Sequence, residues 1–225
     1  MATVHGIPGE WARVRGTIFG LWPLFLSLFL CGIFVGVAVF FSFALGAVLV
    51  VVTLISIWLM LLKGLRHVER FYKGARGEEK VAGILEGLPA HYHVFNDFDA
   101  KGHHIDHVVV GPAGVFSIET KFWSERVSIQ DGHVLVGGRL PSRPPLQQTR
   151  REAQLVRQEL EKSGWKGKVT PVLAFASDTF DSHVAELQGV VILNSNELKS
   201  SFGTQRVVID SVELERVVSL MENSK

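Results

Sequence analysis

The residues best suited to chemistry lie in a strand-like stretch, residues 115–121, that carries both a carboxylate and an amine. Side chains alternate along a strand, so Glu119 and Lys121 share one face. Asp106 opens the preceding strand-like stretch, one hairpin turn away. If the two strands pair around the turn at residues 111–114, both carboxylates converge on the lysine ammonium.

This combination of groups predicts metal-assisted hydrolysis. Two carboxylates that leave coordination positions open to water are what Mg²⁺ prefers. A nearby lysine can orient or deprotonate a water molecule and offset charge on a phosphate. The alternative interpretation is structural: Asp106 as a turn residue, and Glu119 with Lys121 as a solvated ion pair.

Two further polar residues lie on predicted helices. Glu78 sits on the flank of the apolar stripe of a helix predicted over residues 78–88, whereas Glu79 points to water. A carboxylate directed toward a core needs a partner, which a metal or a lysine would supply. Gln148 occupies the first turn of a second helix, predicted over residues 146–162.

Four short motifs follow one another along the chain: residues 74–79 (GARGEE), 105–110 (IDHVVV), 114–121 (GVFSIETK) and 145–148 (PLQQ). Together they resemble the nuclease-related domain, NERD, of the PD-(D/E)XK superfamily. The resemblance covers about residues 74–160. Its specificity comes from the four linked motifs, since a lone Glu-x-Lys is common.

The resemblance implies an α/β fold, a restriction-endonuclease-like mixed sheet flanked by helices. It also implies an activity, the hydrolysis of phosphodiester bonds in DNA or RNA with Mg²⁺ or Mn²⁺. By the same resemblance, Asp106 and Glu119 would hold the metal, and Lys121 would position the attacking water. Glu78 would complete the acidic site. Gln148 would contact the metal-bound water or the nucleic-acid backbone.

Histidines and arginines suggest two more sites. A zinc site is conceivable among five histidines: His91, His93, His103, His104 and His107. No cysteine lies in the domain and no helical His-x-x-x-His occurs, which disfavours zinc. His107 belongs to the resemblance, directly after Asp106, which implies that it is a neighbour of the active site and not a ligand.

An arginine-containing loop follows residue 131, because residues 132–151 contain no acid. The arginines of this loop are Arg139, Arg143, Arg150 and Arg151. Such a loop could grip nucleic-acid phosphates, face anionic lipid or simply be solvated.

Short β-rich stretches and helices must position these residues. An antiparallel meander is predicted from residues 91–96, 105–110, 115–121 and 127–136, the last folded at Asp131-Gly132. Near-continuous apolar strands are predicted at residues 169–176 and 190–193, and a short strand at 206–209. The last helix begins at Asp210, which has capping-box spacing with Glu213.

The N-terminal quarter of the chain predicts a membrane anchor. No Asp, Glu, Lys, Arg or His occurs between Arg15 and Lys63, a run long enough for two spans of about 20 residues each. We expect spans at residues 17–39 and 44–62. A cleaved signal peptide would have a much shorter apolar region, and a single long helix would leave apolar side chains in water.

The predicted organisation is an N-terminal segment (1–16), a transmembrane hairpin (17–63), a juxtamembrane linker (64–73) that prolongs the second helix until Gly74 and Gly77 interrupt it, and a NERD-like domain (74–225). The hairpin is flanked by basic residues on both sides: Arg13, Arg15, Lys63, Arg66, Arg70 and Lys73. This pattern predicts that both termini and the domain are cytoplasmic.

Composition narrows the function only slightly. The chain has 23 Lys+Arg and 22 Asp+Glu, so net charge identifies no partner. The single cysteine, Cys31, lies in the first predicted span, which excludes an intrachain disulfide and fits a reducing compartment. Two hypotheses follow: a membrane-tethered nuclease acting on DNA or RNA, or a catalytically silent module that binds nucleic acid or protein at the bilayer.

Overall fold

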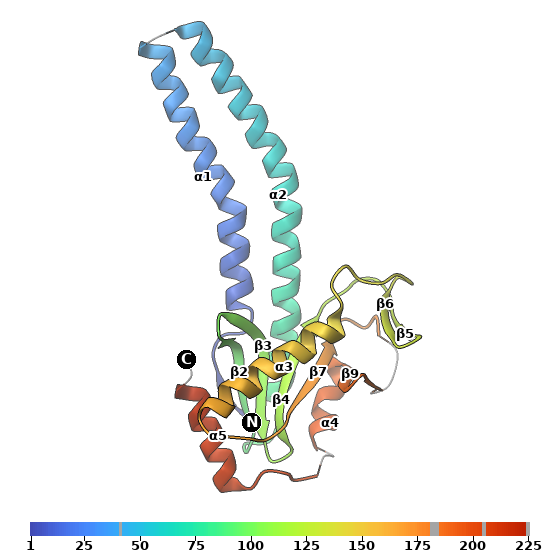
Figure 1. Ribbon diagram of the computed structural model, residues 1–225. Helices are drawn as coiled ribbons and strands as arrows, with labels where there is room; N and C mark the ends of the chain where they lie inside the picture. Colours follow the sequence, from blue (N-terminus) through green and yellow to red (C-terminus); the bar gives the residue numbers. More distant parts are fainter. Residues whose placement is uncertain (41, 181–184, 204–205, 224–225) are drawn as a thin grey trace. The chain divides into compact units, whose positions relative to one another are not determined.

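The computed structural model describes the backbone of residues 1–40, 42–180, 185–203 and 206–223, without the side chains of residues 19, 60–68, 70 and 203. The chain divides into two compact units (Figure 1). A helical unit comprises Trp11–Lys73. The second, the α/β unit, combines Met1–Glu10 with Gly74–Lys225.

The helical unit consists of α1 (Glu10–Phe40) and the first part of α2 (Phe43–Glu86). The two helices lie side by side: Gly46 of α2 adjoins Ala38, and a Cβ built on Gly16 of α1 would lie 2.9 Å from Cβ of Phe71. Small residues therefore permit the close approach. Of the turn predicted at residues 41–43, residue 41 lies outside the described residues.

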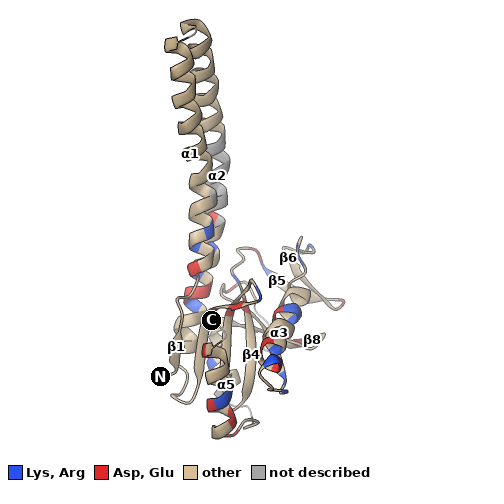
Figure 2. Cartoon of the chain, turned by 60° about the vertical axis from the view of Figure 1, so that its left-hand side comes forward, with Lys and Arg blue, Asp and Glu red and all other residues tan. Residues whose placement is uncertain are grey.

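By length and composition, α1 is apolar enough to cross a membrane, and it contains no Asp, Glu, Lys or Arg after Arg15 (Figure 2, in which such residues are coloured red or blue). Within the described part of the chain, the apolar stretch of α2, Phe43–Leu59, is too short for that test. The predicted basic flank of the second span falls on Lys63, Arg66 and Arg70, whose side chains lie outside the described set.

Helix α2 is continuous to Glu86, which corrects the expectation that Gly74 and Gly77 interrupt it. A glycine costs about 1 kcal/mol relative to alanine inside a helix, too little to end one that packing stabilises. Gly77 also has a packing role. A Cβ at this position would lie 2.8 Å from Cβ of Phe122, so only glycine lets this turn of α2 approach the residue that follows the strand of Lys121.

A mixed seven-stranded sheet forms the centre of the α/β unit. In spatial order its strands are β1 (Thr3–His5), β2 (His93–Ala100), β3 (His103–Gly111), β4 (Gly114–Lys121), β7 (Val169–Phe175), β9 (Val190–Asn194) and β8 (Ala185–Leu187). Strands β2, β3 and β4 are antiparallel neighbours, whereas β4, β7 and β9 are parallel. The predicted antiparallel strands are thus present, and the strands predicted as near-continuous apolar runs, β7 and β9, pair in parallel.

Two sequence expectations about strands were wrong. Strands β5 (Val127–Gln130) and β6 (His133–Val136) form the predicted Asp131-Gly132 hairpin, but as a separate two-stranded sheet and not as part of the meander. Residues 206–209 are not a strand. The backbone N–H groups of Val208 and Ile209 instead donate to the carbonyl of Pro112, so this segment is fixed by a loop.

Helices cover both faces of the main sheet. On one face, α3 (Pro145–Lys162) and α5 (Ser211–Asn223) share a core with the inward side chains of β2, β3 and β4. The C-terminal part of α2 and the short α4 (Leu198–Gly203), preceded by a 3₁₀ turn (Ser195–Glu197), share the other core. Asp210 caps α5 as predicted, accepting a hydrogen bond from the N–H of Glu213 at 2.8 Å.

Candidate functional site

Asp106 lies opposite Glu119 in the sheet. The antiparallel register of β3 and β4 pairs His107 with Ile118, so the next positions outward are Asp106 and Glu119. The backbone N–H of Thr120 donates to Oδ2 of Asp106 at 2.7 Å, which holds that carboxylate against β4. The predicted convergence of the two acids is therefore present.

A hydrogen-bonded network joins β4 to α3. Nζ of Lys121 donates to Oε1 of Glu119 and, at 3.1 Å, to Oε1 of Gln148. Nε2 of Gln148 donates to Oε1 of Glu119 at 2.8 Å and to Oε1 of Glu152 at 2.9 Å. Gln148 thus orients both the amine and the carboxylate of the Glu-x-Lys pair.

Glu152 is the site residue that the sequence analysis missed. It lies one helical turn after Gln148 and is buried, with an exposed fraction of 7%. Burial first, and then the negative charge of Glu119, raise the pKa of Glu152 to about 9. The signal was available: Glu152 lies one turn before Val156 on the predicted buried stripe of this helix, where an acid requires a partner.

Glu78 of α2 completes the acidic group electrostatically. Desolvation, followed by the charges of Glu119, Glu78 and Glu152, raises the pKa of Asp106 well above its ordinary value. Burial by itself lowers the pKa of Lys121, but the surrounding carboxylates outweigh that effect and the pKa is raised. The lysine is therefore a cation held inside a cluster of acids.

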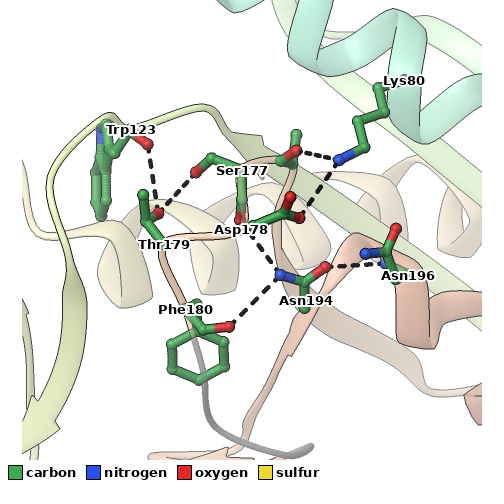
Figure 3. Close-up of polar contacts among 9 residues, drawn as sticks. Lys80, Trp123, Ser177, Asp178, Thr179, Phe180, Asn194 and Asn196 are labelled. Atoms are coloured by element: carbon green, nitrogen blue, oxygen red, sulfur yellow. Dashed lines mark hydrogen bonds and ion pairs between the residues drawn. The ribbon is translucent and has the colours of Figure 1, made fainter.

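A second set of polar contacts positions α2 beside this cluster (Figure 3). Nζ of Lys80 donates to the carbonyl of Ala176 at 2.8 Å, and the N–H of Ala176 donates to the carbonyl of Lys121 at 2.9 Å. Lys80 also lies 3.8 Å from Asp178, an exposed ion pair that contributes little. The ends of β4 and β7 and the helix that carries Glu78 are thus tied together through backbone groups.

The donor set suits a hard divalent cation. Carboxylate oxygens are the ligands of Mg²⁺, which usually takes only one or two from the protein and keeps waters and substrate phosphates for the rest. Among the residues that the structure describes, no three His, Cys, Asp or Glu side chains form a complete metal cage. Asp106 and Glu119 together supply two carboxylates, the number that Mg²⁺ usually takes from a protein.

His107 is a buried neighbour of Asp106. Its Nδ1 lies 2.7 Å from Oδ1 of Asn96, and burial lowers the pKa of its imidazole to about 3. The other histidines of the predicted cluster are spread out: His93 lies 3.4 Å from His5, His104 contacts Asp97, and His103 contacts Arg151.

The four predicted arginines do not form one cluster. Arg139 and Arg143 are exposed in the loop before α3. Arg150 donates to the side chain of Gln188 at 2.8 Å, near the β8 edge of the sheet, and Arg151 contacts His103 in β3. The basic residues therefore lie along the start of α3 and on different sides of it.

Comparison with known proteins gives one similarity. Residues 73–176 match a family model described as a nuclease-related domain, NERD. The matched segment contains the whole network built above, from Glu78 to Glu152. No curated protein and no solved structure matches the chain.

Proposed function

From the match of residues 73–176 to the nuclease-related domain, we propose that this chain is a Mg²⁺-dependent nuclease tethered to a membrane. The observation that carries the proposal is the network of Glu119, Lys121 and Gln148 directly beside Asp106. A domain that only binds has no need of a cation enclosed by acids.

The reaction would be hydrolysis of a phosphodiester bond in DNA or RNA. Asp106 and Glu119 would hold Mg²⁺ or Mn²⁺. The bound ion would lower the pKa of a water molecule and neutralise charge on the phosphate. Lys121 would donate hydrogen bonds to the water and to a phosphate oxygen, and Gln148 would keep its ammonium directed there. The water oxygen would bond to phosphorus and release one proton to solvent, the bond to the leaving oxygen would break, and that oxygen would take up a proton from solvent.

The decisive experiment uses the full chain in detergent with labelled single-stranded DNA, duplex DNA and RNA, in Mg²⁺ or EDTA. Lys121→Ala should lower turnover at least about 100-fold, because an electrostatic donor to the transition state is lost. It should leave Mg²⁺ binding by calorimetry largely intact, since lysine is not a ligand. Lys166→Ala, at an exposed lysine outside the network, is the matched control.

The rival function is a catalytically silent module that binds nucleic acid or protein. Its expected result is Mg²⁺-independent binding with no cleavage of any of the three substrates by the wild-type chain. That outcome would replace the nuclease proposal.

Anchoring in the bilayer is the second part of the proposal, with α1 crossing and α2 returning. Three polar side chains within the apolar helices support it, because Ser27, Thr53 and Ser56 each donate to a backbone carbonyl one turn earlier. Such pairing suits hydrocarbon, where an unsatisfied polar group is costly. Large apolar side chains such as Phe29 and Trp58 are exposed, as expected of a lipid-facing surface.

Strand β1 supports an even number of crossings. It precedes α1 and yet pairs in parallel with β2, which follows α2. The chain therefore returns to the unit it left, and a membrane crossed by α1 has to be crossed again. We propose that both termini and the domain lie in the cytoplasm, where basic flanks favour them.

A further inference from the structure

A cavity of about 340 Å³ lies between the start of α3 and the β5–β6 hairpin, within the size range of small-ligand pockets. Leu140, Pro141 and Pro144 line it from the loop before α3. His133 contributes from β6, and Gln147 from α3. None of these side chains belongs to the network of the proposed active site.

The lining suits a flat heterocycle. Unpaired bases commonly stack on aromatic side chains, which His133 provides, and the proline rings add rigid apolar surface. The amide of Gln147 and the guanidinium of Arg150 supply hydrogen bonds of the kind that a base edge requires, while the amide of Gln188 is engaged within the protein. Leu140 has an exposed fraction of 66%, so its side chain is accessible to a ligand in the cavity.

The cavity is held in shape by polar contacts. Nη1 of Arg150 donates to Oε1 of Gln188 at 2.8 Å and to its carbonyl at 3.2 Å. Nε2 of Gln188 donates to the carbonyl of Gly132, in the turn of the β5–β6 hairpin, at 3.1 Å. The helix, the hairpin and the turn before β9 are therefore fixed relative to one another.

Charge around the cavity favours an anionic chain. Residues 132–151 contain no acid, and Arg139 and Arg143 are exposed in the same loop as Leu140. A nucleic-acid strand presents both features that are matched here, an aromatic base and a phosphate. An aliphatic ligand would match only the apolar lining.

The cavity is also adjacent to the proposed chemistry. Gln147 lines it, and the next residue, Gln148, contacts Glu119 and Lys121. One turn of α3 thus connects the two places.

We propose that this cavity binds an unpaired nucleobase of the strand on which the active site acts. The inference rests on the proposed nuclease function and refines its substrate class to single-stranded or frayed nucleic acid. A paired base has no free face and cannot enter the pocket.

The test compares an oligothymidylate with an abasic oligomer of equal length and charge, bound to the full chain in detergent. Fluorescence anisotropy is measured in Mg²⁺ on a Lys121→Ala background, so that substrate stays intact. Leu140→Ala with His133→Ala should weaken binding of the oligothymidylate about 5- to 100-fold, the value of stacking one base. Affinity for the abasic oligomer, and for a fully paired duplex, should change little.

Val207→Ala is the matched control, because Val207 is exposed to 67% and does not line the cavity. Equal wild-type affinity for base-bearing and abasic oligomers overturns the pocket proposal even if the wild-type chain cleaves. Pocket-dependent binding without any cleavage supports the pocket and rejects the nuclease proposal. The two failures are therefore distinguishable.

Discussion

At the scale of single residues, the site gathers carboxyl groups at one end of β4. Glu119 adjoins Asp106 in the sheet and Glu152 across the gap to α3, while Lys121 supplies the compensating cation. Such an arrangement is destabilising without a metal, because like charges repel and burial removes water. Stability and function should therefore respond in opposite directions when an acid is neutralised.

The Asp106→Asn variant tests whether stability and activity change in opposite directions. It should raise the stability of the metal-free chain by about 1 kcal/mol, a shift of roughly 2–4 °C in midpoint, since a repelling carboxylate is removed. It should also abolish the stabilisation produced by Mg²⁺ and eliminate cleavage. Thermal unfolding with Mg²⁺ or EDTA measures both effects. Unchanged Mg²⁺ stabilisation would show that Asp106 is not a ligand.

Glu152 predicts a pH dependence of stability. Its pKa in the folded chain is about 9 against an ordinary 4.5, so the folded state retains a proton that the unfolded state loses between these values. Folding stability should accordingly fall as pH rises from about 5 to 9. Glu152→Gln, a neutral isostere, should flatten this slope in EDTA.

The control for that measurement is Glu215→Gln, at an exposed position of α5. It should leave the pH profile of the unfolding midpoint as it is in the wild type. A Glu152→Gln profile parallel to the wild type would mean that this carboxyl is ionised in the folded protein at neutral pH.

Residues whose placement depends on local geometry were predictable from sequence. Strand alternation and one hairpin suffice to bring Asp106, Glu119 and Lys121 together. Glu152 depends on how α3 docks on β4, which no local spacing specifies. The buried stripe of α3 is defined by its apolar residues, and only the position of Glu152 on that stripe indicates that this acid is buried.

At the scale of elements, α3 links the chemistry to the rest of the surface. It carries Gln148 and Glu152 toward β4, while Arg150 and Arg151 project to its sides. Replacing Arg139, Arg143, Arg150 and Arg151 with alanine should weaken nucleic-acid binding and flatten its salt dependence. Each lost phosphate contact removes roughly one unit of slope. An unchanged slope would indicate that this surface is solvated or faces lipid.

Two glycines of α2 predict opposite effects on stability. Gly77→Ala should destabilise the chain by about 1–3 kcal/mol, because the new Cβ would meet Cβ of Phe122 at 2.8 Å. Gly83→Ala should stabilise it by roughly 0.5–1 kcal/mol, since nothing lies within 4 Å and alanine favours helix. Chemical denaturation of the two variants compares them directly. Equal effects would exclude tight packing at Gly77.

Elements with a periodic or alternating pattern were predicted well, and short non-local ones were not. The long apolar stripe of α3 and the strands β3, β4 and β7 follow from their sequences. Strand β1 has three residues and pairs with a strand far along the chain, so no local signal marks it. Gly74 and Gly77 were misjudged because the packing of α2 outweighs the intrinsic propensity of glycine.

At the scale of the whole molecule, the proposed topology places both termini on one side of the membrane. Reporter fusions before Met1 and after Lys225 should both report the cytoplasm, because β1 and β2 share a sheet. A fusion inserted after Ser42, between the two helices, should report the opposite side and serves as the control. Termini on opposite sides would rule out the hairpin.

Strand β1 also imposes an order on biosynthesis. It is synthesised before both helices, yet its partner β2 leaves the ribosome only after both helices have been synthesised. Contacts so distant in sequence form late, and until then the outer edge of β2 is an open template for wrong pairing. In the proposed topology, β1 closes this edge only once the chain has entered the bilayer and come back. A chain that has not returned from the bilayer would therefore keep an exposed edge on β2, which is prone to wrong pairing.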